Sequence, residues 1–200
     1  PGVGKTTLAR IIANETKSEF ITFSAVTSGI KEIKKVMEDA EKNKQLGIRT
    51  IVFVDEIHRF NKAQQDAFLP FVEKGSIILI GATTENPSFE INNALLSRCR
   101  VFVLKELSSE DILILLKRAI TSEKGFGKEK IDIKEEDLKT IATFSNGDAR
   151  SALTTLDMII TNAAEEKDGT LKVTEDILED CLTKKTLLYD KNGEEHYNII

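Results

Sequence analysis

The chain has 200 residues, of which 40% are hydrophobic and 30% are charged, and its formal net charge is −5. The acidic total argues against indiscriminate binding of nucleic acid, and no apolar run reaches the roughly 18 residues of a membrane span. Cys99 and Cys181 are too far apart to suggest a zinc site, and isolated thiols suit a reducing compartment, so we expect a globular cytoplasmic protein without a membrane partner.

The first residues read as most of a phosphate-binding loop, G-x-x-x-x-G-K-[ST]. Backbone N–H groups of such a loop can surround an anion, Lys5 would reach the terminal phosphates, and the Thr6 hydroxyl would bind Mg²⁺. A helix predicted over 7–13 would add the positive end of its dipole. A Gly-rich turn before a helix is the plainer alternative. The predicted nucleotide contacts in this loop are Gly2, Val3, Gly4, Lys5, Thr6 and Thr7.

The leading Gly of this motif would fall two positions before Pro1, and the sequence has no initiator Met. We therefore expect a fragment of a longer protein.

A strand is predicted over 19–24, and a helix over 30–45 follows Ser28. On that helix, Lys31, Lys34 and Lys35 share one face by the three-and-four spacing rule. A solvated helix face is the plainer interpretation of these lysines. The functional alternative is a DNA contact, with phosphates bound by the helix start at Ser28 and by the three lysines.

Four consecutive apolar residues, Ile51–Val54, predict a strand buried on both faces of a parallel sheet. Asp55 and Glu56 then fall at its carboxyl end, where open α/β sheets bind ligands. Asp55 is expected to bind Mg²⁺, and Glu56 is expected to polarise the attacking water. Two carboxylates at the end of a buried strand favour a cation site over a plain edge strand. His58 is expected to position its neighbours, because no second metal-ligand candidate lies near it in the sequence.

Further elements complete the α/β part. Asn61 is a predicted N-cap of a helix that Pro70 should kink or end. A third buried strand is predicted over Ser76–Gly81, and a last strand over Val101–Leu104. Between them, Asn92 and Asn93 can cap a short helix.

From Glu106 onward the periodicity is purely helical. Ser108 and Asp111 form a capping-box pattern, residues 125–128 read as a connector, and helices are predicted at about 134–144, 148–163 and 174–182. The boundary between an α/β domain and a helical one is therefore expected near 104–107.

Taken together, these residues resemble an ATPase of the AAA+ superfamily and, within it, the replication-associated recombination protein A (MgsA) family, whose eukaryotic relatives are the Werner-helicase-interacting proteins. The likeness is densest in Asp55–Lys62, Gln64–Asp66 and Gly81–Phe89, segments that are far more specific than a phosphate loop. It implies an α/β fold with a P-loop parallel sheet, its first strand missing, over 1–105 and an all-helical lid over 106–168. The strand order of the superfamily implies that the strand at 50–55 lies between those at 20 and 77, all parallel, with the strand at 101 on the far side of an empty slot. Because the strand before the loop is missing, ATP binding by the fragment alone is expected to be weak. A helical connector and the start of a C-terminal oligomerisation region would occupy 169–200, where Tyr189–Tyr197 resembles the beginning of that region.

The resemblance also implies roles for single residues. Thr84 is similar to the sensor of the γ-phosphate, with Thr83 as the near alternative. Arg98, in Ser97-Arg98-Cys99, is similar to a finger that acts on the ATP of a neighbouring subunit, and Arg150 to the second sensor of the lid. Without the resemblance, a surface ion pair is the plainer interpretation of each arginine.

The function implied is ATP hydrolysis with Mg²⁺ by a DNA-acting, nucleoid-associated protein of replication-fork maintenance, recombination and repair. The implied partners are DNA (single strands or fork and end structures), single-stranded-DNA-binding protein, the replication machinery and further copies of the chain in a tetramer or ring. The alternatives are a clamp-loader subunit, a Holliday-junction branch-migration ATPase, a P-loop nucleotide kinase, which Glu56 disfavours, and a scaffold that binds ATP with negligible hydrolysis.

Overall fold

The structure is a computed structural model that describes residues 2–25 and 28–183. The chain divides into an α/β unit, Gly4–Leu104, and a helical unit from Lys105 onward, with which Gly2 and Val3 are grouped. The predicted likeness at Tyr189–Tyr197 lies outside the described residues. Within the described ranges, no helix is long and apolar enough to cross a membrane.

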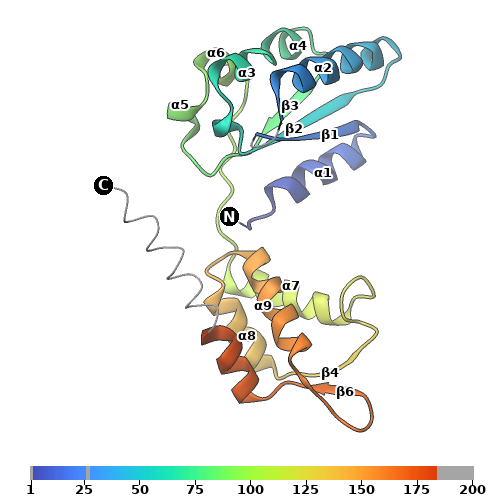
Figure 1. Cartoon of the computed structure of the whole chain (residues 1–200), viewed down its shortest axis with the longest axis vertical. Helices are drawn as coiled ribbons and strands as arrows, with labels where there is room; N and C mark the ends of the chain where they lie inside the picture. The colour runs from blue at the N-terminus through green and yellow to red at the C-terminus, as the bar shows by residue number, and fades with distance from the viewer. Residues whose placement is uncertain (1, 26–27, 184–200) are drawn as a thin grey trace. The chain divides into compact units, whose positions relative to one another are not determined.

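The α/β unit alternates helices and strands along the chain (Figure 1). In order they are α1 (Lys5–Glu15), β1 (Glu19–Ser24), α2 (Ile30–Gln45), β2 (Thr50–Asp55), the 3-10 turn η1 (Ile57–Arg59), α3 (Lys62–Asp66), α4 (Leu69–Glu73), β3 (Ile78–Gly81), α5 (Pro87–Glu90) and α6 (Asn93–Leu96).

The sheet has the order β1-β2-β3 with every pair parallel. The prediction that the strand at 50–55 is central is therefore confirmed. Its residues Thr50–Val54 are all buried, as a strand with neighbours on both edges and both faces requires. The register pairs Ser24 with Asp55 and Val54 with Gly81, so the carboxyl ends of the three strands meet at one edge.

Helices cover both faces of this sheet, with α1 on one side and α2 to α4 on the other (Figure 1). The side chains of β2 alternate between the two layers, as the two-residue period of a strand dictates. Val52 and Val54 join a core cluster with Ile33 and Met37 of α2, while Phe53 packs in a separate cluster that contains Ala9 of α1.

The predicted last strand, Val101–Leu104, is wrong. These residues have no regular secondary structure, and Val101, Phe102 and Val103 are 56%, 81% and 84% exposed. A strand persists only where its N–H and C=O groups find a ladder partner, and none of the described strands pairs with this segment. The apolar run alone therefore does not make a strand here.

The helical unit contains α7 (Ser109–Thr121), β4 (Lys130–Asp132), α8 (Glu135–Phe144), α9 (Ala149–Thr161), β5 (Ala164–Glu165) and β6 (Thr170–Lys172), and residues 175–183 are also helical. The three helices enclose a buried core that includes Ile112 of α7, Ile141 of α8 and Leu156 of α9. The predicted capping box of Ser108 and Asp111 is present at the start of α7.

The expectation that this lid is purely helical needs correction. The unit also carries a three-stranded sheet in the order β4-β6-β5, in which β4 and β6 are parallel and β5 and β6 antiparallel. Strands of two or three residues are too short to show a two-residue period in the sequence.

Candidate functional site

The phosphate loop leads directly into α1. Gly4 is the residue before the helix and has a φ of 89°, and Gly2 has a φ of 64°. Side chains resist this left-handed backbone, so glycine is the residue that both positions favour. Helix α1 begins at Lys5, and its first backbone bond runs from the N–H of Leu8 to the carbonyl of Gly4 at 2.8 Å. The N–H groups of the first turn therefore have no partner within the helix.

The side chains of the loop are partly open to solvent. Val3, Lys5 and Thr6 are half-buried, and Thr7 is exposed. Neither the Lys5 ammonium nor the Thr6 hydroxyl makes a hydrogen bond or ion pair with another residue of the described ranges. A helix start that combines free N–H groups, a lysine and a hydroxyl suits a phosphate ligand.

Asp55 ends β2, and Glu56 turns the chain out of the sheet. Glu56 has φ 49° and ψ 49°, a left-handed conformation that costs a non-glycine residue of order 1 kcal/mol. Two backbone bonds hold this turn against the loop that follows β3: the N–H of Ala82 donates to Val54 at 2.9 Å, and the N–H of Ile57 donates to Ala82 at 3.0 Å. The carboxylates at the end of β2 are thus held beside Thr83 and Thr84.

A short network of side chains connects these two strand ends. The Thr84 hydroxyl donates to Oε2 of Glu56 at 3.4 Å, and Nδ1 of His58 lies 3.2 Å from the same oxygen. Thr83 Oγ1 lies 2.9 Å from Nδ1 of His58 and accepts from the N–H of Glu85 at 3.0 Å. Both threonines that the sequence proposed as sensors therefore belong to the network, Thr84 directly and Thr83 through His58.

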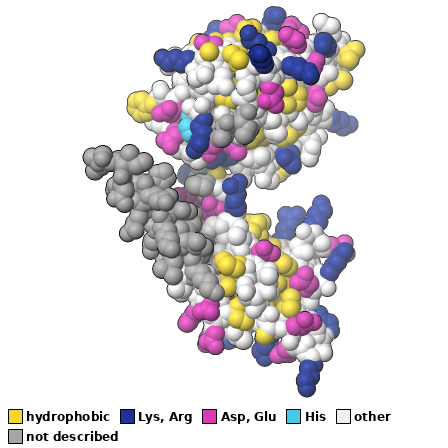
Figure 2. Space-filling view, viewed as in Figure 1, with side chains coloured by type: hydrophobic (Ala, Val, Ile, Leu, Met, Phe, Trp, Pro, Cys, Tyr) yellow, Lys and Arg dark blue, Asp and Glu magenta, His cyan; other side chains and the backbone are white. Residues whose placement is uncertain are grey.

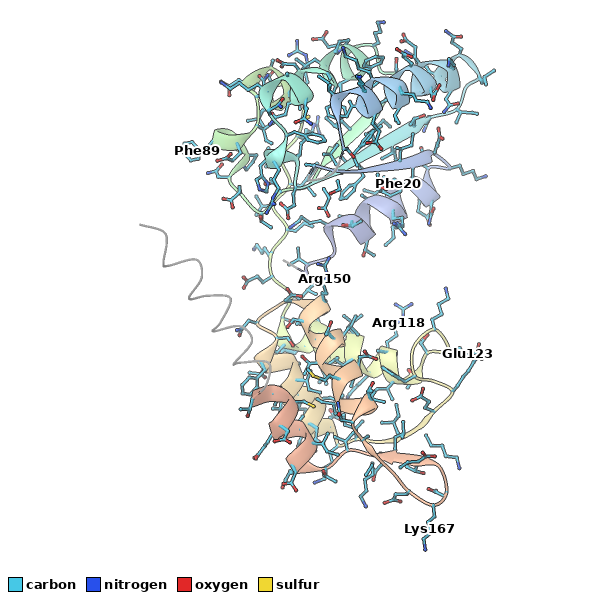
Figure 3. All side chains as sticks on the ribbon, viewed as in Figure 1. Phe20, Phe89, Arg118, Glu123, Arg150 and Lys167 are labelled. Carbon is cyan, nitrogen blue, oxygen red and sulfur yellow. The ribbon has the colours of Figure 1, made fainter. Side chains whose placement is uncertain are left out.

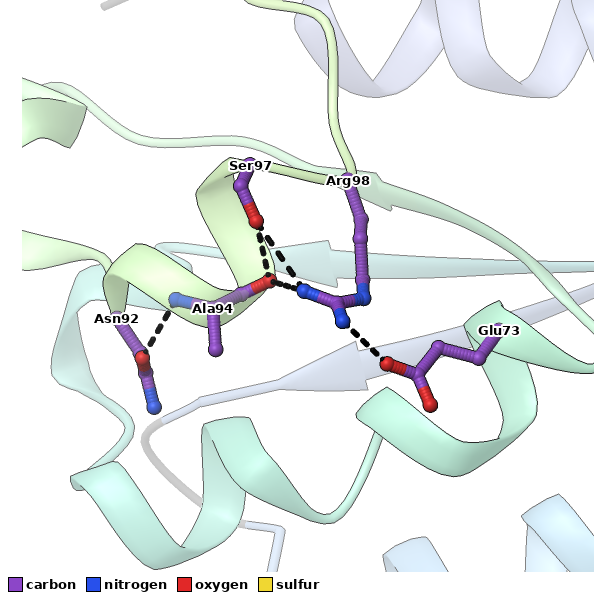
Figure 4. Close-up of polar contacts among 5 residues, drawn as sticks. All are labelled: Glu73, Asn92, Ala94, Ser97 and Arg98. Carbon is purple, nitrogen blue, oxygen red and sulfur yellow. Dashed lines mark hydrogen bonds and ion pairs between the residues drawn. The ribbon is translucent and has the colours of Figure 1, made fainter.

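Arg98 lies in another corner of the α/β unit, at the end of α6 (Figure 4). Asn92 caps this helix by accepting from the N–H of Ala94 at 2.9 Å. Nη1 of Arg98 donates to the carbonyl of Ala94 at 2.7 Å and to Ser97 Oγ at 3.2 Å, and Nη2 forms an ion pair with Glu73 Oε1 at 2.5 Å. The guanidinium and Glu73 are both exposed. Partial desolvation raises the pKa of the neighbouring Cys99 thiol above its usual value, although the residue as a whole is exposed.

Sequence reasoning assigned no role to Gln65, which connects the segment after β2 with the start of α6. Its side chain is 2% exposed and fully hydrogen-bonded. Nε2 donates to the carbonyls of Phe60 at 2.9 Å and Glu90 at 3.2 Å, and Oε1 accepts from the N–H of Asn92 at 2.7 Å. Gln65 thereby ties the segment after Glu56 to the residue that caps α6. No sequence pattern marks this role, because a glutamine in a short helix usually faces water.

The three lysines of the proposed DNA contact, Lys31, Lys34 and Lys35, are exposed on α2. The helix start at Ser28 was expected to bind phosphates, but the N–H of Ser28 already has a partner within the chain. Ser28 is 9% exposed, its N–H donates to Ser24 at 3.0 Å, and its carbonyl accepts from Gln64 at 3.2 Å. Figure 2 shows Lys and Arg side chains interspersed with acidic ones over the visible face, without one continuous basic patch.

Arg150 belongs to the helical unit, where Figure 3 shows it at the start of α9. Asp148 caps this helix by accepting from the N–H of Ser151 at 2.8 Å. The Arg150 side chain is exposed and forms no ion pair with the residues that the structure describes.

The residues suit Mg²⁺ only together with a nucleotide. In residues 2–25 and 28–183 there is no group of three or more His, Cys, Asp or Glu side chains that could hold a metal. Mg²⁺ is commonly bound through one or two protein oxygens together with water and substrate phosphates. Thr6 and Asp55 have the hydroxyl and carboxylate oxygens that such a site uses.

Comparison with known proteins places these features in context. A model of the "ATPase family associated with various cellular activities (AAA)" matches residues 1–107, and a model of the "AAA C-terminal domain" matches residues 127–200. The chain is 49% identical to replication-associated recombination protein A of Haemophilus influenzae and 48% identical to that of Escherichia coli K12. Both matches cover 100% of this chain but 45% of the relative, so the chain spans less than half the length of these relatives.

A solved structure supports the same fold. A single-substitution variant of Thermotoga maritima RuvB superposes with a TM-score of 0.70 at 25% sequence identity, covering 92% of this chain and 58% of that one. The predicted fold class and the resemblance stated from the sequence are therefore confirmed.

Proposed function

The chain belongs to the AAA family of ATPases, and from that premise we propose that it hydrolyses ATP to ADP and phosphate where β2 and β3 end. The observation that carries the proposal is the position of Glu56. Its carboxylate lies at the end of the central strand beside Asp55, within 3.4 Å of the Thr84 hydroxyl. A carboxylate at this position suits a group that orients and deprotonates a water.

The phosphate loop would supply the binding part of the reaction. The N–H groups at the start of α1 would hold phosphate oxygens, and Lys5 would neutralise charge on the terminal phosphates. Thr6 and Asp55 would hold Mg²⁺, which when bound neutralises charge that develops on the phosphate oxygens. The Thr84 hydroxyl would contact the γ-phosphate as a sensor.

We further propose that the two arginines complete the site from elsewhere. Arg98 would act on the nucleotide of a neighbouring copy of the chain, and Arg150 would act from the lid on the nucleotide of its own subunit. A cation at the γ-phosphate stabilises the transition state more than the ground state. Support for this part comes from the likeness of Ser97-Arg98-Cys99 and Gly147–Arg150 to the family motifs.

The larger role that we propose is action on DNA in replication-fork maintenance, recombination and repair. Its support is the similarity over the whole chain to proteins named replication-associated recombination protein A. In this role the exposed lysines of α2 would contact DNA phosphates. We propose single-stranded-DNA-binding protein, the replication machinery and further copies of the chain as partners, in the nucleoid region of the cytoplasm.

Steady-state ATP hydrolysis by the longer protein that contains this chain, with and without DNA, tests the proposal. We expect turnover that DNA changes, and a Glu56→Gln variant that binds ATP without turning it over. Tight ATP binding by the unaltered protein without turnover in either condition would favour a nucleotide-dependent scaffold instead.

A further inference from the structure

We propose that His58 is a positioning residue, whose Nδ1 holds the Glu56 carboxylate in the orientation needed for hydrolysis and links it to Thr83. The proposal rests on the hydrolytic role assigned to Glu56 above. It concerns a side chain that has no other assigned part in the reaction.

The geometry around His58 is tight. Its side chain is 15% exposed, less than half the 32% of Glu56, so the ring is the better fixed partner of the pair. Nδ1 lies 3.2 Å from Glu56 Oε2 and 2.9 Å from Thr83 Oγ1. One ring nitrogen therefore meets the carboxylate that follows β2 and the hydroxyl that follows β3.

The contact with Glu56 determines which tautomer of the His58 ring is favourable. A carboxylate only accepts, so the contact with Glu56 is favourable only when Nδ1 carries the proton. In the opposite tautomer Thr83 would donate to Nδ1, and the nitrogen lone pair would face the negative oxygen. The contact with Glu56 therefore selects the Nδ1–H tautomer, in which Thr83 shares the proton as a second acceptor.

The contacts of Oε2 determine which oxygen of Glu56 can accept a hydrogen bond from water. His58 and Thr84 both contact Oε2, and no described residue forms a hydrogen bond with Oε1. Fixing Oε2 leaves Oε1 as the oxygen that can accept from an attacking water. A general base needs this placement, since the water must lie within about 3 Å of the accepting atom.

Three substitutions in the longer protein separate this role from simple packing. Asn places an amide N–H near the position of Nδ1, Gln places it near Nε2, and Leu supplies no donor. We expect His58→Leu to lower kcat about tenfold or more with ATP affinity unchanged within about threefold. His58→Asn should recover most of the turnover, and His58→Gln should not.

Single-turnover measurements in a Glu56→Gln background supply the second readout. If His58 acts through Glu56, His58→Leu should lower the residual rate little further. A full additional loss in that background would overturn the proposal, as would equal turnover of the Asn and Gln variants. If His58→Leu does not fold, the two polar variants still decide the matter through their difference. Undiminished turnover by Glu56→Gln itself would instead refute the proposed function.

Discussion

Two of the charged groups proposed for hydrolysis, Glu56 and Arg98, lie at the ends of β2 and α6, and these two corners of the α/β unit are built differently. At the end of β2, Glu56 lies in a network with His58, Thr83 and Thr84 that draws on two neighbouring strands. At the end of α6, Arg98 is bonded to its own helix and to the exposed Glu73. In the first corner, side chains from two strand ends hold the carboxylate. In the second corner, the cation is exposed at the surface. This contrast is what a base acting in its own subunit and a cation acting on another would require.

The sharpest test of the contrast is Glu56→Gln, for which we expect the largest effect. The amide is close in size but cannot take a proton from water, so turnover should fall by about 10³-fold. ATP affinity should change little, because the amide removes no proposed phosphate contact. Steady-state turnover and direct nucleotide binding check both parts. Turnover within tenfold of the unaltered protein would contradict the assignment.

Arg98→Ala should have the next largest effect, a loss of about 10²-fold in turnover, as for removal of one charge-stabilising donor at a transition state. ATP binding should stay within a few-fold, because the cation contributes little to the ground state. The measurement uses the longer protein that contains this chain, in which the proposed subunit contacts could form.

Mixing the Arg98→Ala and Glu56→Gln variants then tests whether Arg98 acts on a neighbouring subunit. A subunit with Arg98→Ala keeps its base, and one with Glu56→Gln keeps its arginine, so mixed oligomers should regain some turnover. A mixture that has assembled and is still as inactive as the separate variants would show that Arg98 serves its own subunit or none.

Buried Gln65 bridges the corners, and its loss should destabilise the fold. Gln65→Leu leaves the N–H of Asn92 and the carbonyls of Phe60 and Glu90 without the partner they now have. Unpaired buried polar groups of this kind should lower the free energy of unfolding by about 2 kcal/mol or more. Denaturant unfolding measures this, with Gln64→Leu as a control, since the Gln64 side chain is less buried, donates to the Ser28 carbonyl and accepts from the N–H of Asn61. Equal stability of the two variants would contradict the bridging role.

Whether the sequence predicts a feature of these two sites depends on how far apart in the chain the interacting residues are. The buried strand at Ile51–Val54, its terminal acids and the caps at Asn61 and Ser108 are local patterns, and the structure contains all of them. The contact of His58 with Thr83 joins residues 25 positions apart and was not predictable from spacing. The run Val101–Leu104 failed as a strand for a related reason, since its apolar residues do not specify a pairing partner.

The exposed lysines of α2 test whether the surface of this helix contributes to DNA binding. Replacing Lys31, Lys34 and Lys35 together with Ala should weaken DNA binding about tenfold near physiological salt and reduce the slope of log K against log salt by about 2. The matched control is Lys117→Ala, on α7 of the other unit, where the ammonium is paired with Glu135 at 3.0 Å. Fluorescence anisotropy across a salt series gives both numbers. An unchanged slope would return the three lysines to a solvated helix face.

The smallest effect is expected for Glu73→Gln, and it bears most directly on how Arg98 is held. Both partners of this ion pair are exposed, with side chains 41% and 50% accessible, so the pair should contribute under about 1 kcal/mol. Arg98 would keep its bond to the carbonyl of Ala94, and turnover should stay within about threefold. The matched control is Glu41→Gln, which removes the exposed partner of Lys74 on the same unit. If Glu73→Gln instead lost as much turnover as Arg98→Ala while Glu41→Gln did not, the ion pair would be part of the working position of Arg98. The guanidinium would then act from where Glu73 holds it, and the contrast between an organised corner and an open one would fail.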